Sequence, residues 1–131
     1  KNKNSQNPLY FLQSAVSYYY SEAKTFESID WKSILEIYDV QLKYSYSPII
    51  RLNRIVPYYK VYGAKKGLMT LENLYKDIDL KNNHLYYSIK GQLLIELNKK
   101  KAAKKALLQA IDLTKNEIQR NHLTKKLSAI A

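Results

Sequence analysis

The fold is decided by residues 83–113, which read NHLYYSIKGQLLIELNKKKAAKKALLQAIDL. Apolar residues recur every three or four positions in this stretch, which is the spacing of one buried face of an α-helix. A polar break at Asn98 interrupts the pattern, so we expect two helices joined by a turn, over about 83–97 and 100–114. Gly91 and Ala103 are small enough to let the two backbones approach closely.

The order of bulky and small residues in this helix pair is typical of a tetratricopeptide repeat, a helix–turn–helix unit of 34 residues. The first helix of such a repeat carries bulky, small and bulky side chains, and the second carries small ones where it crosses the first. The residues that we predict to pack the pair together are Tyr87, Gly91 and Leu94 on the first helix and Ala103, Leu107 and Ala110 on the second.

The segments on either side extend this pattern. Two helices over 48–62 and 64–77 form a poorer copy, with Pro57 expected to kink or split the first of them. A last helix over 116–130 would cap the stack, since a terminal repeat needs its apolar face covered. The residues that give the poorer copy its likeness are Tyr58, Gly67, Leu71 and Leu74.

Two further helices are expected nearer the N-terminus, over 8–23 and 31–44, and no window alternates with the period of a strand. The predicted fold class is therefore all-α, with about seven antiparallel helices in a tetratricopeptide-like right-handed stack. Residues 1–7 are polar and without periodicity, and we expect them to be a disordered lead-in to one domain over 8–131. Because the chain begins with Lys1 rather than Met, we also expect it to be an excised part of a longer gene product.

Residue usage argues against catalysis. The chain has no cysteine, which excludes thiol nucleophiles, thiolate metal sites and disulfides. Its two histidines, His84 and His122, are far apart in sequence and match no metal-ligand spacing. No nucleophile, phosphate-loop or cofactor motif is present, so we expect no enzyme activity, no cofactor and no metal. No apolar run is long enough to cross a bilayer, and the expected location is the cytoplasm.

The charge is uneven. The whole chain has a formal net charge of +11, and residues 81–131 contain 11 basic and three acidic side chains. A basic half of this kind suits an acidic partner such as a nucleic acid. The same excess of Lys, with Asn, Ile and Tyr, is also typical of AT-rich coding sequence. A run of lysines forms the candidate basic patch: Lys99, Lys100, Lys101, Lys104 and Lys105. In the alternative interpretation, this run is simply the solvated face of a helix.

Three polar residues fall at positions that face neighbouring helices. If the helices over 31–44 and 48–62 are antiparallel neighbours, Arg54 can pair with Asp39 across their seam. Asn53 would then satisfy backbone groups or face a groove. These three residues, with His84 as a fourth candidate, act either as a network that fixes the register of two helices or as direct contacts to a partner.

Six segments, in order, give the chain a resemblance to a known family. They are NPLYFLQSAVS (7–17), DWKSILEIYD (30–39), SPIIRLNR (47–54), GAKKGL (63–68), NHLYYSIKGQLL (83–94) and NEIQR (116–120). Together they resemble the C-terminal tetratricopeptide-like domain of certain extracytoplasmic-function RNA polymerase sigma factors. The matching residues include Asp39, Asn53, Arg54 and His84, whereas Pro57 and Asn98 depart from the family pattern.

This resemblance implies a regulatory, protein-interaction domain within a protein that directs RNA polymerase to promoters. Its partners would be the sigma domains of the same chain, RNA polymerase or a regulator, and promoter DNA would be bound through domains that precede this one. No membrane partner is implied. Two alternatives remain open: a freestanding tetratricopeptide-like adaptor that binds a peptide or protein, and a basic nucleic-acid-binding helical module.

Overall fold

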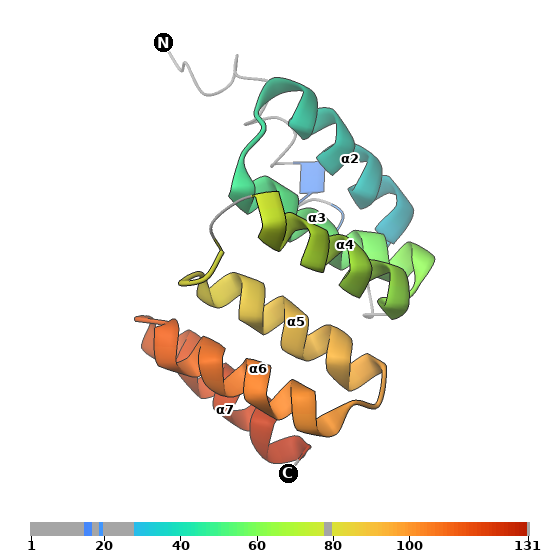
Figure 1. Ribbon diagram of the computed structural model, residues 1–131. Coiled ribbons are helices and arrows are strands. Elements are labelled where there is room, and N and C mark those ends of the chain that lie inside the picture. The colour runs from blue at the N-terminus through green and yellow to red at the C-terminus, as the bar shows by residue number, and fades with distance from the viewer. Residues whose placement is uncertain (1–14, 17–18, 20–27, 78–79, 131) are drawn as a thin grey trace. The chain divides into compact units, whose positions relative to one another are not determined.

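A computed structural model describes residues 15–16, 19, 28–77 and 80–130 of the chain (Figure 1). All regular elements among these residues are helices. Their bounds are Trp31–Tyr44 (α2), Pro48–Tyr62 (α3), Ala64–Asp77 (α4), His84–Glu96 (α5), Lys100–Leu113 (α6) and Glu117–Ala129 (α7).

The all-helical prediction is confirmed, and each of these six helices lies within one residue of its predicted bounds. The count is six rather than about seven. The expected first helix, over 8–23, lies outside the described residues except at positions 15, 16 and 19, which are helical, and the lead-in over 1–7 lies outside them entirely. No helix in the described part of the chain is long and apolar enough to cross a membrane.

Side-chain caps explain why the boundaries could be predicted. A cap oxygen accepts hydrogen bonds from N–H groups that have no partner inside the first helical turn. Asp30 caps α2 by accepting from the Ser33 backbone N–H at 3.1 Å and from the Ser33 hydroxyl at 2.8 Å. These bonds, the hydroxyl first, hold the pKa of the Asp30 carboxyl below its usual value. Ser47 caps α3 by accepting from the Ile49 N–H at 3.2 Å.

The chain divides into two compact units, Lys1–Val61 and Tyr62–Ala131. In the described part of the first unit, α2 and α3 run antiparallel. Arg54 of α3 meets Asp39 of α2, and the Lys60 ammonium lies 5.6 Å above the Trp31 ring at the other end of the pair. The fully buried side chains of this unit include Ile34, Leu52 and Ile55.

Pro57 lies inside α3, which is assigned as one continuous helix from Pro48 to Tyr62, so the predicted split does not occur. A proline removes a single backbone donor, and it is tolerated where the residues around it stay packed. Pro57 is itself buried, and so are Ile55 and Tyr59 on either side of it.

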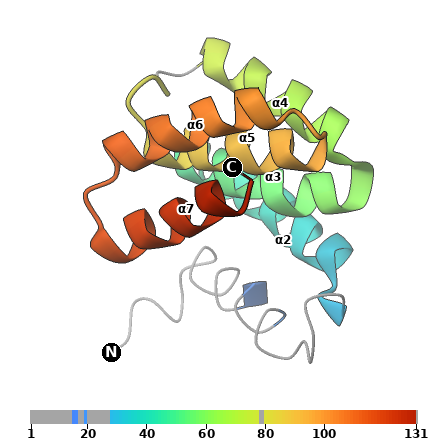
Figure 2. The same cartoon turned by 90° about the horizontal axis from the view of Figure 1, so that it is seen from below.

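The second unit contains α4 to α7, and each of these helices packs against the next one in the chain (Figures 1 and 2). Gly63 precedes α4 with a φ of 103°, a left-handed conformation that glycine adopts without strain. Leu71 and Leu74 of α4 are buried as predicted. Tyr75 of the same helix is 39% exposed. It lies at the rim of a hollow between α4 and α5.

Candidate functional site

Helices α5 and α6 approach each other closely at Gly91. A Cβ atom built on Gly91 would lie 2.7 Å from Leu107 Cδ2 and 2.9 Å from Leu107 Cγ, and the Ala103 carbonyl oxygen would be 3.6 Å away. The six residues predicted to pack this pair are all buried: Tyr87, Gly91, Leu94, Ala103, Leu107 and Ala110.

The turn between α5 and α6 depends on Asn98, which has a φ of 60°. The Lys99 N–H donates to the Leu94 carbonyl at 2.9 Å across this residue, which is the bond pattern of a left-handed helix cap. Glycine is the usual residue in this conformation, and asparagine is the side chain that tolerates it best. The departure from glycine noted in the sequence therefore leaves the turn intact.

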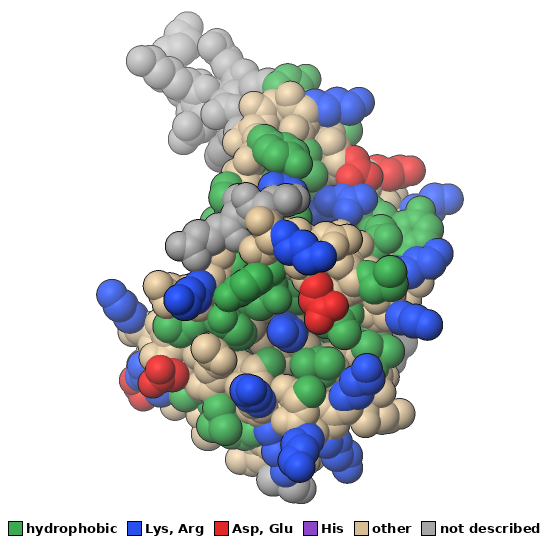
Figure 3. Space-filling model, viewed as in Figure 1, with side chains coloured by type: hydrophobic (Ala, Val, Ile, Leu, Met, Phe, Trp, Pro, Cys, Tyr) green, Lys and Arg blue, Asp and Glu red, His purple; other side chains and the backbone are tan. Residues whose placement is uncertain are grey.

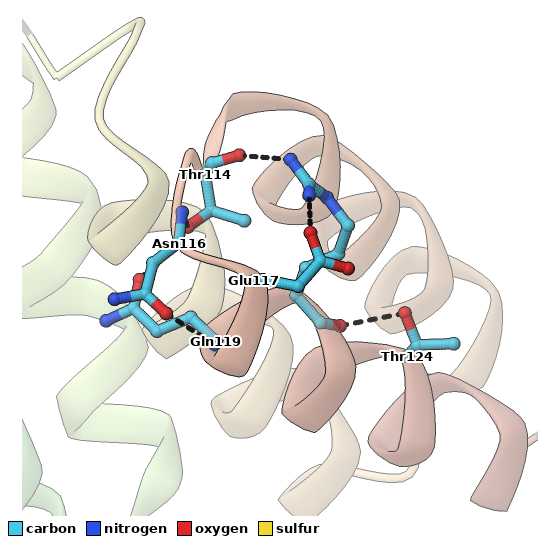
Figure 4. A network of polar contacts seen from close by, with 6 residues as sticks. Thr114, Asn116, Glu117, Gln119 and Thr124 are labelled. Atoms are coloured by element: carbon cyan, nitrogen blue, oxygen red, sulfur yellow. Dashed lines mark hydrogen bonds and ion pairs between the residues drawn. The ribbon is translucent and has the colours of Figure 1, made fainter.

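A polar network fixes the next turn, between α6 and α7 (Figure 4). Thr114 is 2% exposed, and its hydroxyl donates to Gln119 Oε1 at 3.0 Å and accepts from the Asn116 N–H at 3.4 Å. Asn116 caps α7 by accepting from the Gln119 N–H at 3.0 Å. Arg120 donates to the Thr114 carbonyl at 2.7 Å and to Glu117 Oε1 at 2.8 Å. These bonds set the direction in which α7 leaves α6.

With both turns fixed, the side chains of α5 and α7 enclose a hollow of about 290 Å³. We name this hollow the α5/α7 groove. It is lined by His84, Leu85 and Ser88 of α5 and by Ile118, Gln119, His122 and Leu123 of α7.

The groove combines exposed apolar area with groups that form hydrogen bonds. Ile118 is 81% exposed at its edge, whereas Leu123 is 3% exposed and lies at its base. No carboxylate or ammonium group belongs to the lining. One helical turn beyond His122 lies Lys126, and burial lowers the pKa of its ammonium group.

The structure brings together two histidines that were interpreted as solitary. His84 and His122 line the same groove from different helices. A signal for this was present in the sequence, because six of the lining residues form pairs that are one 34-residue repeat apart: His84 and Ile118, Leu85 and Gln119, Ser88 and His122. Within the described ranges, no group of three or more His, Cys, Asp or Glu side chains is placed to hold a metal ion.

The structure joins only two of the four residues expected to form either a register network or direct contacts to a partner. Arg54 Nε lies 2.6 Å from Asp39 Oδ1, and the Arg54 guanidinium stacks 5.0 Å from the Tyr58 ring centre. Asn53 is half-buried on α3. His84 belongs to the second unit and lines the α5/α7 groove. The Asp39–Arg54 pair thus links α2 to α3, as a register network would.

The lysine run occupies the start of α6. Its side chains are exposed apart from Lys104, which is half-buried, while Ala103, Leu107 and Ala110 of the same helix are buried. Lys99 stands at the N-cap of α6 without making a side-chain cap bond. This arrangement is that of a charged outer face on a helix whose opposite face is packed.

Comparison with known proteins adds to this geometry. No protein-family model matches the chain. An uncharacterized protein of Rhizobium meliloti (strain 1021) is 28% identical over 122 residues, which make up 93% of this chain. The chain spans only 28% of the length of that relative.

Two solved structures resemble the chain over nearly its whole length. The first tetratricopeptide domain of Spaghetti (RPAP3), bound to the HSP90 peptide SRMEEVD, matches with a TM-score of 0.68 and 19% identity over 94% of this chain and 92% of that one. The chain has a tetratricopeptide-like fold. The first such domain of human RPAP3 matches with a TM-score of 0.66 and 19% identity, over 95% of this chain and 94% of that one.

The sigma-factor identification made from the sequence is contradicted by these comparisons and is withdrawn. The solved structures that share the fold are domains of RPAP3, not of a sigma factor. RNA polymerase, sigma domains and promoter DNA therefore lose their support as partners, as do the expected roles in transcription and DNA binding. The physical reason is that the five matching segments in the described part of the chain contain helix caps, turn residues and a small crossing residue, which any stack of helical repeats requires.

Proposed function

We propose that the chain is a tetratricopeptide-like adaptor that binds an acidic peptide segment of a partner protein in the α5/α7 groove. The observation that carries this proposal is the groove itself, in which exposed apolar and hydrogen-bonding side chains from two repeat-related helices converge. A similar fold in RPAP3 binds the acidic peptide SRMEEVD. Tetratricopeptide-like stacks are typically interaction modules rather than catalysts.

Charge favours an acidic peptide over a neutral one. The chain carries a net charge of +11, and most of that excess lies in residues 81–131, which contain both walls of the groove. Long-range attraction of this kind raises the rate of encounter with an anionic partner and weakens as salt is added. The neutral lining then supplies contacts to the apolar parts of the peptide.

The direct test is the affinity of labelled SRMEEVD for the chain and for a variant with a carboxylate in the groove. Ile118→Asp should weaken binding by about tenfold or more, since it removes apolar contact and repels the acidic peptide. The fold should survive, because Ile118 is 81% exposed.

Leu108→Asp is the matched control. Leu108 is an aliphatic residue of α6 that is 55% exposed and lies outside the groove lining. Leu108→Asp makes the same change in charge and hydrophobicity as Ile118→Asp. It should leave the affinity for SRMEEVD within about twofold of that of the unmodified chain. No measurable binding of SRMEEVD by the unmodified chain, or equal losses in the two variants, would contradict the proposal.

A further inference from the structure

A second and larger hollow lies between α4 and α5. Its volume is about 580 Å³. We name it the α4/α5 hollow. It is lined by Met69, Glu72, Asn73, Tyr75 and Lys76 of α4 and by Tyr86, Tyr87 and Lys90 of α5.

The α4/α5 hollow has an aromatic wall and an exposed apolar edge. The Tyr75 and Tyr86 ring centres lie 5.0 Å apart, and Tyr87 meets Tyr86 edge-on at the same distance. Tyr86 is 3% exposed and forms the base, whereas Met69 is 58% exposed at the edge. Methionine and tyrosine are common at surfaces that bind apolar side chains, because each offers a large adaptable contact area.

Positive charge surrounds this apolar area. Lys76 and Lys90 belong to the lining, against a single carboxylate from Glu72, and the Lys90 ammonium lies 5.7 Å above the Tyr86 ring. Leu68, the residue before Met69, packs against the buried cluster that Leu94 of α5 forms with Ala103 and Ala106 of α6. The start of α4 therefore lies beside the helical turn that carries the lysine run. Figure 3 shows hydrophobic side chains emerging among Lys and Arg side chains on this face.

The two hollows lie on opposite faces of α5. Successive residues of a helix are rotated by about 100°, so the groove residues His84, Leu85 and Ser88 point about 200° away from Tyr86, Tyr87 and Lys90. A peptide in the α5/α7 groove would therefore leave the α4/α5 hollow open to a different segment.

We propose that the α4/α5 hollow is a second docking site, which takes one apolar side chain of an acidic partner segment. The apolar side chain inserts between Met69 and Tyr75, and carboxylates beside it pair with Lys76, Lys90 and the lysine run of α6. This site stands on its own contacts and does not depend on the proposed role of the groove. An adaptor with both sites holds two acidic segments on opposite faces of one helix.

The test compares three fluorescein-labelled peptides by anisotropy with the full chain. EEELEEE carries an apolar anchor among carboxylates, EEESEEE lacks the anchor, and KKKLKKK reverses the charge. We expect EEELEEE to bind at least about tenfold more tightly than either of the others, since burial of one leucine and attraction between opposite charges each contribute. Equal binding of EEESEEE, or preferred binding of KKKLKKK, would overturn the proposal.

Variants then locate the site. Met69→Glu should weaken EEELEEE binding at least about tenfold, whereas Leu108→Glu, the same change on an exposed aliphatic residue of α6, should leave it within about twofold. The comparison of Met69→Glu with Leu108→Glu is repeated in the Ile118→Asp background, so that binding of EEELEEE in the α5/α7 groove does not contribute to it. If Ile118→Asp abolishes binding and Met69→Glu does not, the peptide uses the groove and the second site is refuted.

Discussion

The closest test of the packing is the substitution Gly91→Ala. The new Cβ would lie 2.7 Å from Leu107 Cδ2, roughly 1 Å inside the ordinary carbon–carbon contact of about 3.5–4.0 Å. Leu107 is fully buried, so its side chain has little freedom to move away. Overpacking of this kind costs about 1–3 kcal/mol, and the better helix propensity of alanine offsets up to about 1 kcal/mol.

We therefore expect Gly91→Ala to destabilise the chain by about 1–2 kcal/mol and to lower Tm by roughly 3–10 °C. Urea unfolding followed by far-ultraviolet circular dichroism measures the change in free energy of unfolding. The cause can be isolated with Leu107→Ala, which should remove the clash. The double variant should be more stable than the sum of the two single effects predicts, by about 1 kcal/mol.

An unchanged or raised Tm for Gly91→Ala would refute the reasoning, because alanine is the better helix former wherever space allows. The reasoning would also be contradicted if the effects of Gly91→Ala and Leu107→Ala on the free energy of unfolding were strictly additive. Additive effects would mean that residue 91 and Leu107 do not meet in the folded chain.

Three further predictions follow from single contacts. Burial, and then the Glu72 carboxylate, raises the pKa of Tyr86 to about 12, so the unfolded chain ionises this phenol at lower pH than the folded chain does. The free energy of unfolding should thus fall between pH 10 and 12. Unfolding curves should show that this fall is about 2 kcal/mol smaller in Tyr86→Phe than in the unmodified chain, and identical pH profiles of the two proteins would contradict this. Asn98→Gly should raise the free energy of unfolding by about 0.5–1 kcal/mol, because glycine has no Cβ to strain at a φ of 60°, and a lower Tm would speak against the left-handed cap. Thr114→Val keeps the buried volume but removes the hydroxyl that bonds to Gln119, so calorimetry should record a loss of about 1 kcal/mol, and no loss would argue against the network.

The helices could be predicted because their ends carry local signals. Asp30, Ser47, Asn83 and Asn116 each cap the helix that follows, and periodic apolar residues define what lies between the caps. The close crossing at Gly91 could also be predicted from the sequence, since a small residue between two bulky ones on a helix face leaves room for the backbone of a neighbouring helix.

Features that depend on which helix covers which face were harder to predict. Tyr75 has the spacing of a core residue, yet it lies at an edge where α4 and α5 leave a hollow. Gln41 is 1% exposed on α2 and lies seven positions after the buried Ile34, so helical spacing places it on the core face although its polar amide argues against burial. The proximity of His84 and His122 required comparing positions one repeat apart rather than searching for adjacent ligands.

The sigma-factor interpretation failed for a related reason. In the described part of the chain, the segments that suggested it contain the capping, crossing and turn residues of the helical stack, so they indicate the fold and not the function of the protein. Function had to be inferred from the surface instead, where the 34-residue period places side chains of α5 and α7 around one groove.

The central claim is that this groove binds an acidic peptide, and amide chemical shifts of the isotope-labelled chain during titration with SRMEEVD test it most directly. We predict that the saturable shifts concentrate at the groove residues of α5 and α7, including Leu85, Ser88 and His122, and that they shrink as salt is raised. Shifts confined to other helices, or no saturable shift at millimolar peptide, would contradict the account.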